Sequence, residues 1–215
     1  MRAAIRDVEI EPPGLPGILY LPARPLGLII FAHGGGSSRL SPRNARVAER
    51  LSARGFACLL FDLLQPGEAA DRRNVFDIPL LAERLRGAVD WARREEETGR
   101  LPIGLFGAST GGGAALVAAA DAPDDIGAVV SRGGRPDLAG AALPRVAAPT
   151  LLVVGGDDVE VLALNRQALA ALRCRAELAI VPGATHLFEE PGKLEDVVAL
   201  SGDWFLEHLP REQPD

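Results

Sequence analysis

The string GASTG at residues 107–111 constrains the fold of this chain more than any other feature. It follows the apolar run 102–106 and precedes the alanine-rich stretch 112–120. This order predicts a strand, a sharp turn and a helix, with the hydroxyl of Ser109 raised above the carboxyl end of the strand. Glycines on both sides of the turn let the strand and the helix pass close together. The pattern therefore predicts a nucleophilic serine on an α/β sheet.

Two further segments carry the partners that such a serine requires. An apolar strand at 150–154 ends in Gly155-Gly156-Asp157-Asp158, and a strand at 177–181 leads to His186. A serine hydroxyl becomes a good nucleophile only when a base takes its proton, and the pKa of imidazole suits that task. A carboxylate on the other ring nitrogen fixes the tautomer. The predicted triad is Ser109, Asp158 and His186, in a different chain order from that of trypsin-like or subtilisin-like proteases.

The base is chosen by elimination and the acid by its spacing from neighbouring residues. Of three histidines, His208 falls in the last turn of the C-terminal helix, where we expect a solvated side chain that suits the helix dipole. His33 belongs to another motif, so His186 is left as the base. The acid turn is expected to have a glycine three residues before the aspartate and a valine three residues after it. Gly155, Asp158 and Val161 have this spacing, so Asp158 is favoured as the acid, and Asp157 is then expected to be a loop or helix-capping carboxylate.

The segment HGGGSS at 33–38 follows the early strand and is predicted to form an oxyanion hole. We expect one backbone N–H from Gly35, with Gly34 as the alternative, and a second from Thr110, the residue after the nucleophile. His33 is expected to orient this loop and to border the substrate. A phosphate-binding loop is disfavoured, because no Lys-Ser or Lys-Thr follows and the pattern G-x-G-x-x-G is absent.

The strings HGGGSS, GASTG, GGDDVEV and PGATHLFEEPG resemble the α/β-hydrolase superfamily and, within it, the dienelactone hydrolase-like family. The resemblance covers about residues 8–209. The chain also looks like the hydrolase domains that some bacteria carry fused to a phosphoribosyltransferase domain. The resemblance implies a triad enzyme that needs no cofactor or metal. Dienelactone hydrolase itself uses a cysteine nucleophile, so Ser109 favours ordinary ester chemistry instead of a dienelactone substrate.

Four arginines follow strand ends near the predicted nucleophile: Arg72, Arg73, Arg132 and Arg135. They raise the alternative of an anionic substrate, since arginine binds carboxylates through a planar fork. Dienelactone hydrolases bind a carboxylate-bearing substrate, so the resemblance implies the same alternative. The opposing interpretation is structural. Lys193 is the one lysine of the chain, so arginine serves as its general basic residue, and Arg72 or Arg73 could pair with Asp71 or Asp77.

Composition excludes several other classes of protein. A net charge of −6 without a basic block argues against a nucleic-acid partner. Apolar runs are too short for a membrane span, and the first residues lack the apolar core of a signal peptide. Two cysteines far apart, with no metal-ligand spacing, fit a reduced cytoplasm and no metal site. The length suits a single domain over residues 1–215, and the oligomeric state is left open.

The fold class that follows is a doubly wound α/β fold, with about eight mostly parallel strands and helices on both faces. Strands are expected at 6–10, 17–21, 26–32, 56–62, 102–106, 127–131, 150–154 and 177–181. Helices are expected at 42–54, 78–98, 109–120, 161–172 and 194–209. The first two strands should form an antiparallel edge hairpin. Residues 133–148 can hold only one short helix, so no lid domain is expected.

The function predicted from these features is hydrolysis of small carboxylic esters or lactones through an acyl-enzyme on Ser109. An acyltransferase or perhydrolase would share the same acyl-enzyme. A non-catalytic protein that binds a ligand on a hydrolase scaffold is the alternative from another class, because a fold does not fix a function.

Overall fold

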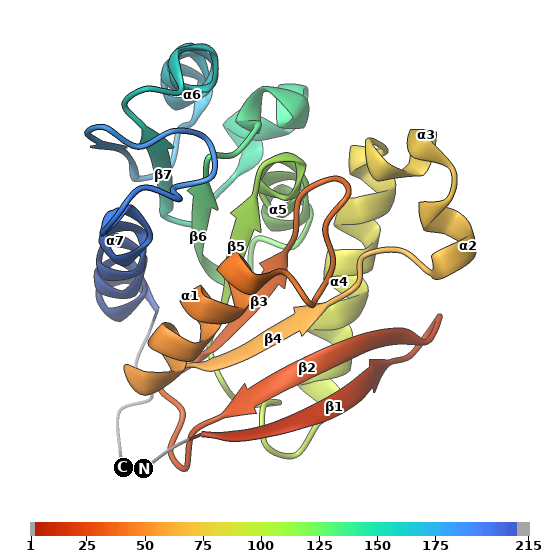
Figure 1. Cartoon of the computed structure of the whole chain (residues 1–215). Coiled ribbons are helices and arrows are strands. Elements are labelled where there is room, and N and C mark those ends of the chain that lie inside the picture. Colours follow the sequence, from red (N-terminus) through yellow and green to blue (C-terminus); the bar gives the residue numbers. More distant parts are fainter. Residues whose placement is uncertain (1–2, 210–215) are drawn as a thin grey trace.

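The computed structural model describes residues 3–209 and is organised around one eight-stranded sheet. The strand order is β1-β2-β4-β3-β5-β6-β7-β8 (Figure 1). The strands are β1 (Ala4–Ile10), β2 (Leu15–Leu21), β3 (Leu28–Ala32), β4 (Ala57–Phe61), β5 (Ile103–Ala108), β6 (Ile126–Arg132), β7 (Thr150–Gly155) and β8 (Ala176–Val181). Each predicted strand is present, with bounds shifted by at most a few residues.

Parallel pairing runs through the sheet from β4 to β8, and the antiparallel part is confined to one edge. There β1 pairs with β2, and β2 pairs with β4, in the antiparallel sense. Strands β3, β5 and β6 are neighbours in parallel register, with Ala32 opposite Gly107 and Ala108 opposite Arg132. The carboxyl ends of these strands therefore meet at one edge of the sheet, where open α/β sheets place their ligands.

Helices cover both faces of the sheet. Helices α1 and α7 pack on one face, and α4, α5, α6 and the 3₁₀ segment η1 pack on the other (Figure 1). The bounds are α1 (Pro42–Ala53), α2 (Pro66–Ala69), α3 (Arg72–Val75), α4 (Ile78–Arg94), α5 (Thr110–Asp121), η1 (Pro136–Arg145), α6 (Val159–Ala171) and α7 (Lys193–His208). Only η1 lies between β6 and β7, so the predicted absence of a lid domain holds for this interval.

The two-sided burial follows from the side-chain alternation within each central strand. In β3, Leu28, Ile30 and Ala32 belong to the core beneath α4 and α5, whereas Ile29 and Phe31 belong to the core beneath α1 and α7. Successive side chains of a strand point to opposite faces. A strand buried on both faces must therefore be apolar throughout, which explains the unbroken apolar runs of the sequence.

The segment between β4 and α4 differs from the sequence prediction. Its two single-turn helices, α2 and α3, were not expected, because one turn is too short to show an apolar period. Asp71 caps α3 by accepting the N–H of Arg73 at 2.9 Å, and Asp77 caps α4 by accepting the N–H of Leu80 at 3.0 Å. Helix α4 also ends at Arg94 instead of residue 98, because Glu95 has extended backbone angles.

His208 corrects another expectation. Its side chain is only 7% exposed, and its ring packs edge-on against Trp204 with 4.0 Å between ring centroids. Burial lowers the pKa of this imidazole. The prediction of a solvated, dipole-stabilising histidine is wrong, because α7 turns this residue toward the core.

Within residues 3–209, no helix combines the length and the apolar character that a bilayer crossing would need.

Candidate active site

Ser109 occupies a strained turn between β5 and α5. Its backbone angles are φ 52° and ψ −123°, a region that non-glycine residues rarely adopt. The turn is held by backbone hydrogen bonds on both sides, since Ser109 N–H donates to Arg132 O at 3.3 Å and Arg135 N–H donates to Ser109 O at 3.0 Å. Strain of this kind persists only where the surroundings over-determine it, and it is concentrated at functional sites. The geometry agrees with the sharp turn expected from GASTG.

Two glycines of the motif are required by close backbone approach. A Cβ atom at Gly107 would lie 2.5 Å from the carbonyl oxygen of Gly111. A Cβ atom at Gly111 would lie 2.2 Å from the carbonyl oxygen of Ala32 on the neighbouring strand. Side chains at these positions would push α5 away from β3 and β5, and Ser109 would move with it.

Replacing Gly111 by alanine is therefore expected to destabilise the protein by about 3 kcal/mol or more, because rigid backbone must shift. The matched control is Gly87→Ala in α4, where a Cβ atom meets nothing within 4 Å. That change should stabilise the protein by up to about 1 kcal/mol through helix propensity. Urea unfolding of both variants measures the difference, and equal stabilities would contradict the packing argument.

His186 and Asp158 form a close polar pair. His186 Nδ1 lies 2.7 Å from Asp158 Oδ2, and the carboxylate is the more buried of the two groups. A carboxylate can only accept, so the proton of the imidazole lies on Nδ1 and Nε2 is left as the free basic nitrogen. This arrangement gives His186 the tautomer that a general base requires.

The structure separates the two adjacent aspartates. Asp158 occupies the N-cap position of α6, but its side chain makes no capping hydrogen bond and is free to bind His186. The side chain of Asp157 is exposed and has no hydrogen bond to His186. It does not cap α6, whose N-cap is Asp158, so of the two expected roles Asp157 has that of a loop carboxylate.

The turn after β6 brings the histidine toward the serine. Gly133 follows Arg132 with φ 49°, and a Cβ atom there would lie 3.1 Å from His186 O and 3.5 Å from His186 Nδ1. The imidazole therefore packs on the turn whose preceding carbonyl binds Ser109 N–H. Within the described residues the only hydrogen bond of the His186 ring is the one to Asp158. In triad enzymes without substrate, the hydrogen bond from the serine hydroxyl to the histidine is often long, and it tightens when substrate binds.

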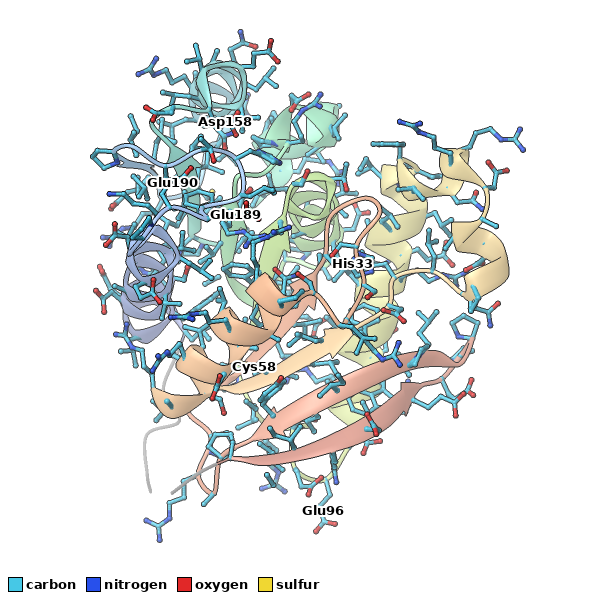
Figure 2. All side chains as sticks on the ribbon, in the orientation of Figure 1. His33, Cys58, Glu96, Asp158, Glu189 and Glu190 are labelled. Atoms are coloured by element: carbon cyan, nitrogen blue, oxygen red, sulfur yellow. The ribbon has the colours of Figure 1, made fainter. Side chains whose placement is uncertain are left out.

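A carboxylate that the sequence analysis did not single out holds the histidine loop. Glu190 Oε1 accepts the N–H of Thr185 at 3.0 Å and the hydroxyl of Thr185 at 2.5 Å. These bonds lower the pKa of Glu190. Glu189 binds Arg43 of α1 at 2.7 Å, and Asp158, Glu189 and Glu190 lie together on the β7–β8 side in Figure 2. The acidic pair in PGATHLFEEPG was the available signal.

His33 supports the glycine loop. Its Nε2 accepts the N–H of Leu63 at 3.2 Å, so the proton lies on Nδ1, which donates to Gly34 O at 3.0 Å. Burial lowers the pKa of this imidazole. A neutral ring with both nitrogens bound to backbone positions the loop, as expected.

The glycine loop touches the nucleophile directly. A Cβ atom at Gly34 would lie 2.9 Å from Ser109 Cβ, so this backbone lies against the serine. The N–H of Gly35, the expected first oxyanion donor, instead donates to Thr110 Oγ1 at 2.8 Å. Gly35 could bind an oxyanion only by sharing or exchanging this bond. Gly34 therefore gains weight as the alternative donor, while Thr110 begins α5 beside Ser109 as expected.

Three of the four candidate arginines are already engaged. The side chain of Arg73 is 89% exposed and bound to Asp71. Arg72 lies over the ring of Phe76, 5.9 Å from its centroid. Arg135 binds Asp137 at 2.7 Å. These contacts favour the structural interpretation of these three side chains.

Arg132 is different. It is 7% exposed, and its Nε and Nη1 are buried without a hydrogen-bond partner among the described residues. Burial, with the nearby charge of Arg43, lowers the pKa of Arg132 to about 10. An enclosed guanidinium without a carboxylate is costly. Arg132 is thus the remaining arginine of the four that could attract an anion.

A cavity of about 190 Å³ opens beside the glycine loop, on the side of β4. Apolar side chains from the β4–α4 segment line it, together with residues 33–38 and Thr110: Leu63, Leu64, Pro66, Ala69, Val75 and Leu81. The cavity was not expected from the sequence, because part of its wall comes from single-turn helices that show no apolar period.

Comparison with known proteins agrees with the fold. A family model described as alpha/beta hydrolase fold matches residues 27–169. A structure of dienelactone hydrolase from Anabaena variabilis is 51% identical, with a TM-score of 0.94, and the match covers 98% of this chain and 100% of that one. The quorum-quenching protein AidA of Acinetobacter baumannii is 34% identical over 118 residues, which are 53% of this chain and 38% of AidA.

A longer relative occurs in Mycobacterium tuberculosis, where it is provisionally named a phosphoribosyl transferase. It is 56% identical over 209 residues, which make up 95% of this chain but 47% of the relative. The chain thus spans about half the length of that protein. The family model and the Anabaena structure, whose match extends over the whole fold, both indicate an α/β-hydrolase. The chain belongs to the α/β-hydrolase fold family and, within it, to the dienelactone hydrolase-like proteins.

Proposed function

We propose that this protein is a serine hydrolase that cleaves small carboxylic esters or lactones. The observation that carries the proposal is the 2.7 Å bond from His186 Nδ1 to Asp158, with the His186 ring packed on the turn after β6 that also binds the strained Ser109 backbone. In the proposed reaction Ser109 attacks the carbonyl carbon, and His186 Nε2 takes the serine proton and returns it to the departing alkoxide. Water, activated by the same base, then releases the acid from the acyl-enzyme.

The charge that develops on the carbonyl oxygen needs donors fixed in advance. The N–H of Thr110, at the start of α5, is one proposed donor, and a glycine of the loop, Gly35 or Gly34, is the other. The 12-residue helix α5 adds the positive end of its dipole at the same place. No group of this proposed machinery requires a metal or cofactor. The unpaired thiols of Cys58 and Cys174 are the basis for proposing that the protein works in the cytoplasm.

The name of the longer mycobacterial relative describes a protein of which this chain matches about half. Its transferase activity is therefore not proposed for the present fold. The bond between His186 and Asp158 and the strained turn at Ser109 are the reasons to prefer an enzyme over a non-catalytic binding protein.

The proposal is tested by treating the protein with a fluorophosphonate and mapping the adduct, alongside hydrolysis of a panel of p-nitrophenyl esters and lactones. Labelling of Ser109 together with turnover of esters supports a serine hydrolase. Absence of both labelling and turnover would favour the non-catalytic alternative. Acyl transfer to added alcohols or peroxide at the expense of hydrolysis would favour the transferase or perhydrolase alternative.

Arg132 gives a specific reason to propose that the substrate can carry a negative charge on the side of β6. Arg132→Met should lower kcat/KM by roughly ten- to a hundredfold for an ester with a carboxylate in its alcohol part, because a charge-assisted bond is lost. A neutral ester of the same size should be unaffected. The control is Arg145→Met, which removes an exposed arginine paired with Asp121. Equal losses on both esters would assign Arg132 a structural role only.

A further inference from the structure

The cavity of about 190 Å³ lies on a defined side of the nucleophile. Ser109 follows β5, which lies between β3 and β6 in the sheet. The cavity is enclosed by the segments after β3 and β4 and by α2, α3 and the start of α4. His186 and Asp158 follow β8 and β7, and the imidazole packs on the turn after β6. In Figure 2 His33, after β3, lies well apart from Asp158, after β7.

This separation assigns the two halves of an ester to the two sides. The leaving alkoxide must receive its proton from His186, so the alcohol part has to lie on the β6–β8 side. The carbonyl oxygen points to the oxyanion donors between Thr110 and the glycine loop. The acyl chain is then directed away from His186, toward the cavity that Thr110 and residues 34–36 border.

The walls of the cavity indicate what kind of acyl group it takes. Its side chains are mainly aliphatic, and its two titratable side chains, Asp62 and His33, are already engaged. Asp62 binds Arg39 at 2.5 Å, and the buried His33 uses both ring nitrogens. Neither Arg72 nor Arg73 is among the lining residues. An acyl group with a free carboxylate would find an aspartate and no available cation here.

We propose that this cavity is the acyl-binding pocket, selective for a neutral, apolar acyl group about as large as a phenyl ring or a six-carbon chain. The size follows from the volume, because an apolar protein cavity of about 150 Å³ holds benzene. The assignment rests on the proposed ester hydrolysis and deepens it. It places any anionic recognition on the alcohol side, where Arg132 lies.

The pocket predicts a chain-length series. For p-nitrophenyl acetate, butanoate, hexanoate and decanoate, kcat/KM should rise about fourfold for each methylene group buried. The increase from acetate to butanoate should be at least about tenfold, and it should end when the cavity is full, near hexanoate. A monoester of succinate, with a charged acyl end, should react much more slowly than butanoate. A flat series, or a preference for the succinate ester, would overturn the assignment.

Two substitutions change the pocket at positions outside the glycine loop, and their effect is read as a ratio of two esters because Val75 Cγ1 packs close to Gly35. Ala69→Phe adds a ring to an exposed lining residue and should lower the ratio of kcat/KM for hexanoate to that for acetate at least about fivefold. Val75→Ala removes two methyl groups from a half-buried wall and should shift the optimum toward longer chains. The matched control is Ala70→Phe, at an exposed neighbour that does not line the cavity. If all three variants keep the wild-type ratio, the pocket is elsewhere.

Binding to the Ser109→Ala variant tests the pocket independently of turnover. Calorimetric titration should show p-nitrophenyl hexanoate binding at least about tenfold more tightly than the acetate, and Ala69→Phe in this background should abolish the difference. Equal affinities would overturn the acyl-pocket assignment even if the wild-type protein hydrolyses esters. Selective binding without any hydrolysis or fluorophosphonate labelling of the wild type would retain a ligand pocket and reject the proposed function instead.

Discussion

Replacing Ser109 by alanine is expected to reduce kcat for ester hydrolysis by about 10⁶-fold, the loss seen when the nucleophile of a serine protease triad is removed. The change deletes one hydroxyl from a half-buried side chain and leaves the backbone bonds of the turn intact. Alanine also lacks any group that could replace the nucleophile. The variant should therefore fold normally and lose fluorophosphonate labelling. Steady-state kinetics with p-nitrophenyl butanoate and mass spectrometry of the labelled protein measure both effects.

A useful control is Ser38→Ala, which lies in the glycine loop beside the cavity but is not placed in the triad. Its effect on kcat should be smaller by orders of magnitude. Full activity in Ser109→Ala, or covalent labelling at another residue, would contradict the assignment of the nucleophile. Thermal unfolding of both variants shows whether an observed loss comes from chemistry or from misfolding.

The second large effect is expected at the acid. Asp158→Asn should lower kcat by about 10⁴-fold, as in the serine-protease precedent. The asparagine amide has the size of the carboxylate but can donate to Nδ1 of His186. It then favours the tautomer with the proton on Nε2, and that nitrogen can no longer accept the proton of Ser109. The 2.7 Å bond between His186 Nδ1 and Asp158 Oδ2 is the contact that this substitution alters.

Asp157→Asn is the matched control, since it makes the same chemical change one residue away on an exposed side chain. Its kcat should stay within a few-fold of the wild type. The reverse order of effects would move the acid to Asp157, and two small effects would place the acid elsewhere. Because the substitution acts on the base, the rate at which a fluorophosphonate labels Ser109 should also fall in Asp158→Asn.

Most of the chemistry was readable from local patterns. GASTG between an apolar run and an alanine-rich run specified a strand, a strained turn and a helix. Only glycine fits at its first and last positions, because a Cβ atom there would clash with neighbouring backbone. The apolar runs predicted a parallel sheet buried on both faces, and each run marked the position of one strand. The candidates Ser109, Asp158 and His186 followed from such local context, since each lies in the turn or loop that follows a strand of the parallel part of the sheet.

Contacts between distant segments could not be read in this way. The burial of Arg132 without a hydrogen-bond partner among the described residues and the engagement of Gly35 N–H by Thr110 depend on how remote segments pack after the sheet has formed. The burial of His208 depends on which face α7 turns toward the core. The cavity is decided in the same way, because its walls combine the loop after β3, the segment after β4, α4, α5 and two single-turn helices that show no periodic pattern. The positions of the strands and the chemistry of the turns are local properties of the chain, whereas the order of the strands in the sheet, long-range hydrogen-bond partners and cavity shape arise only when remote segments pack together.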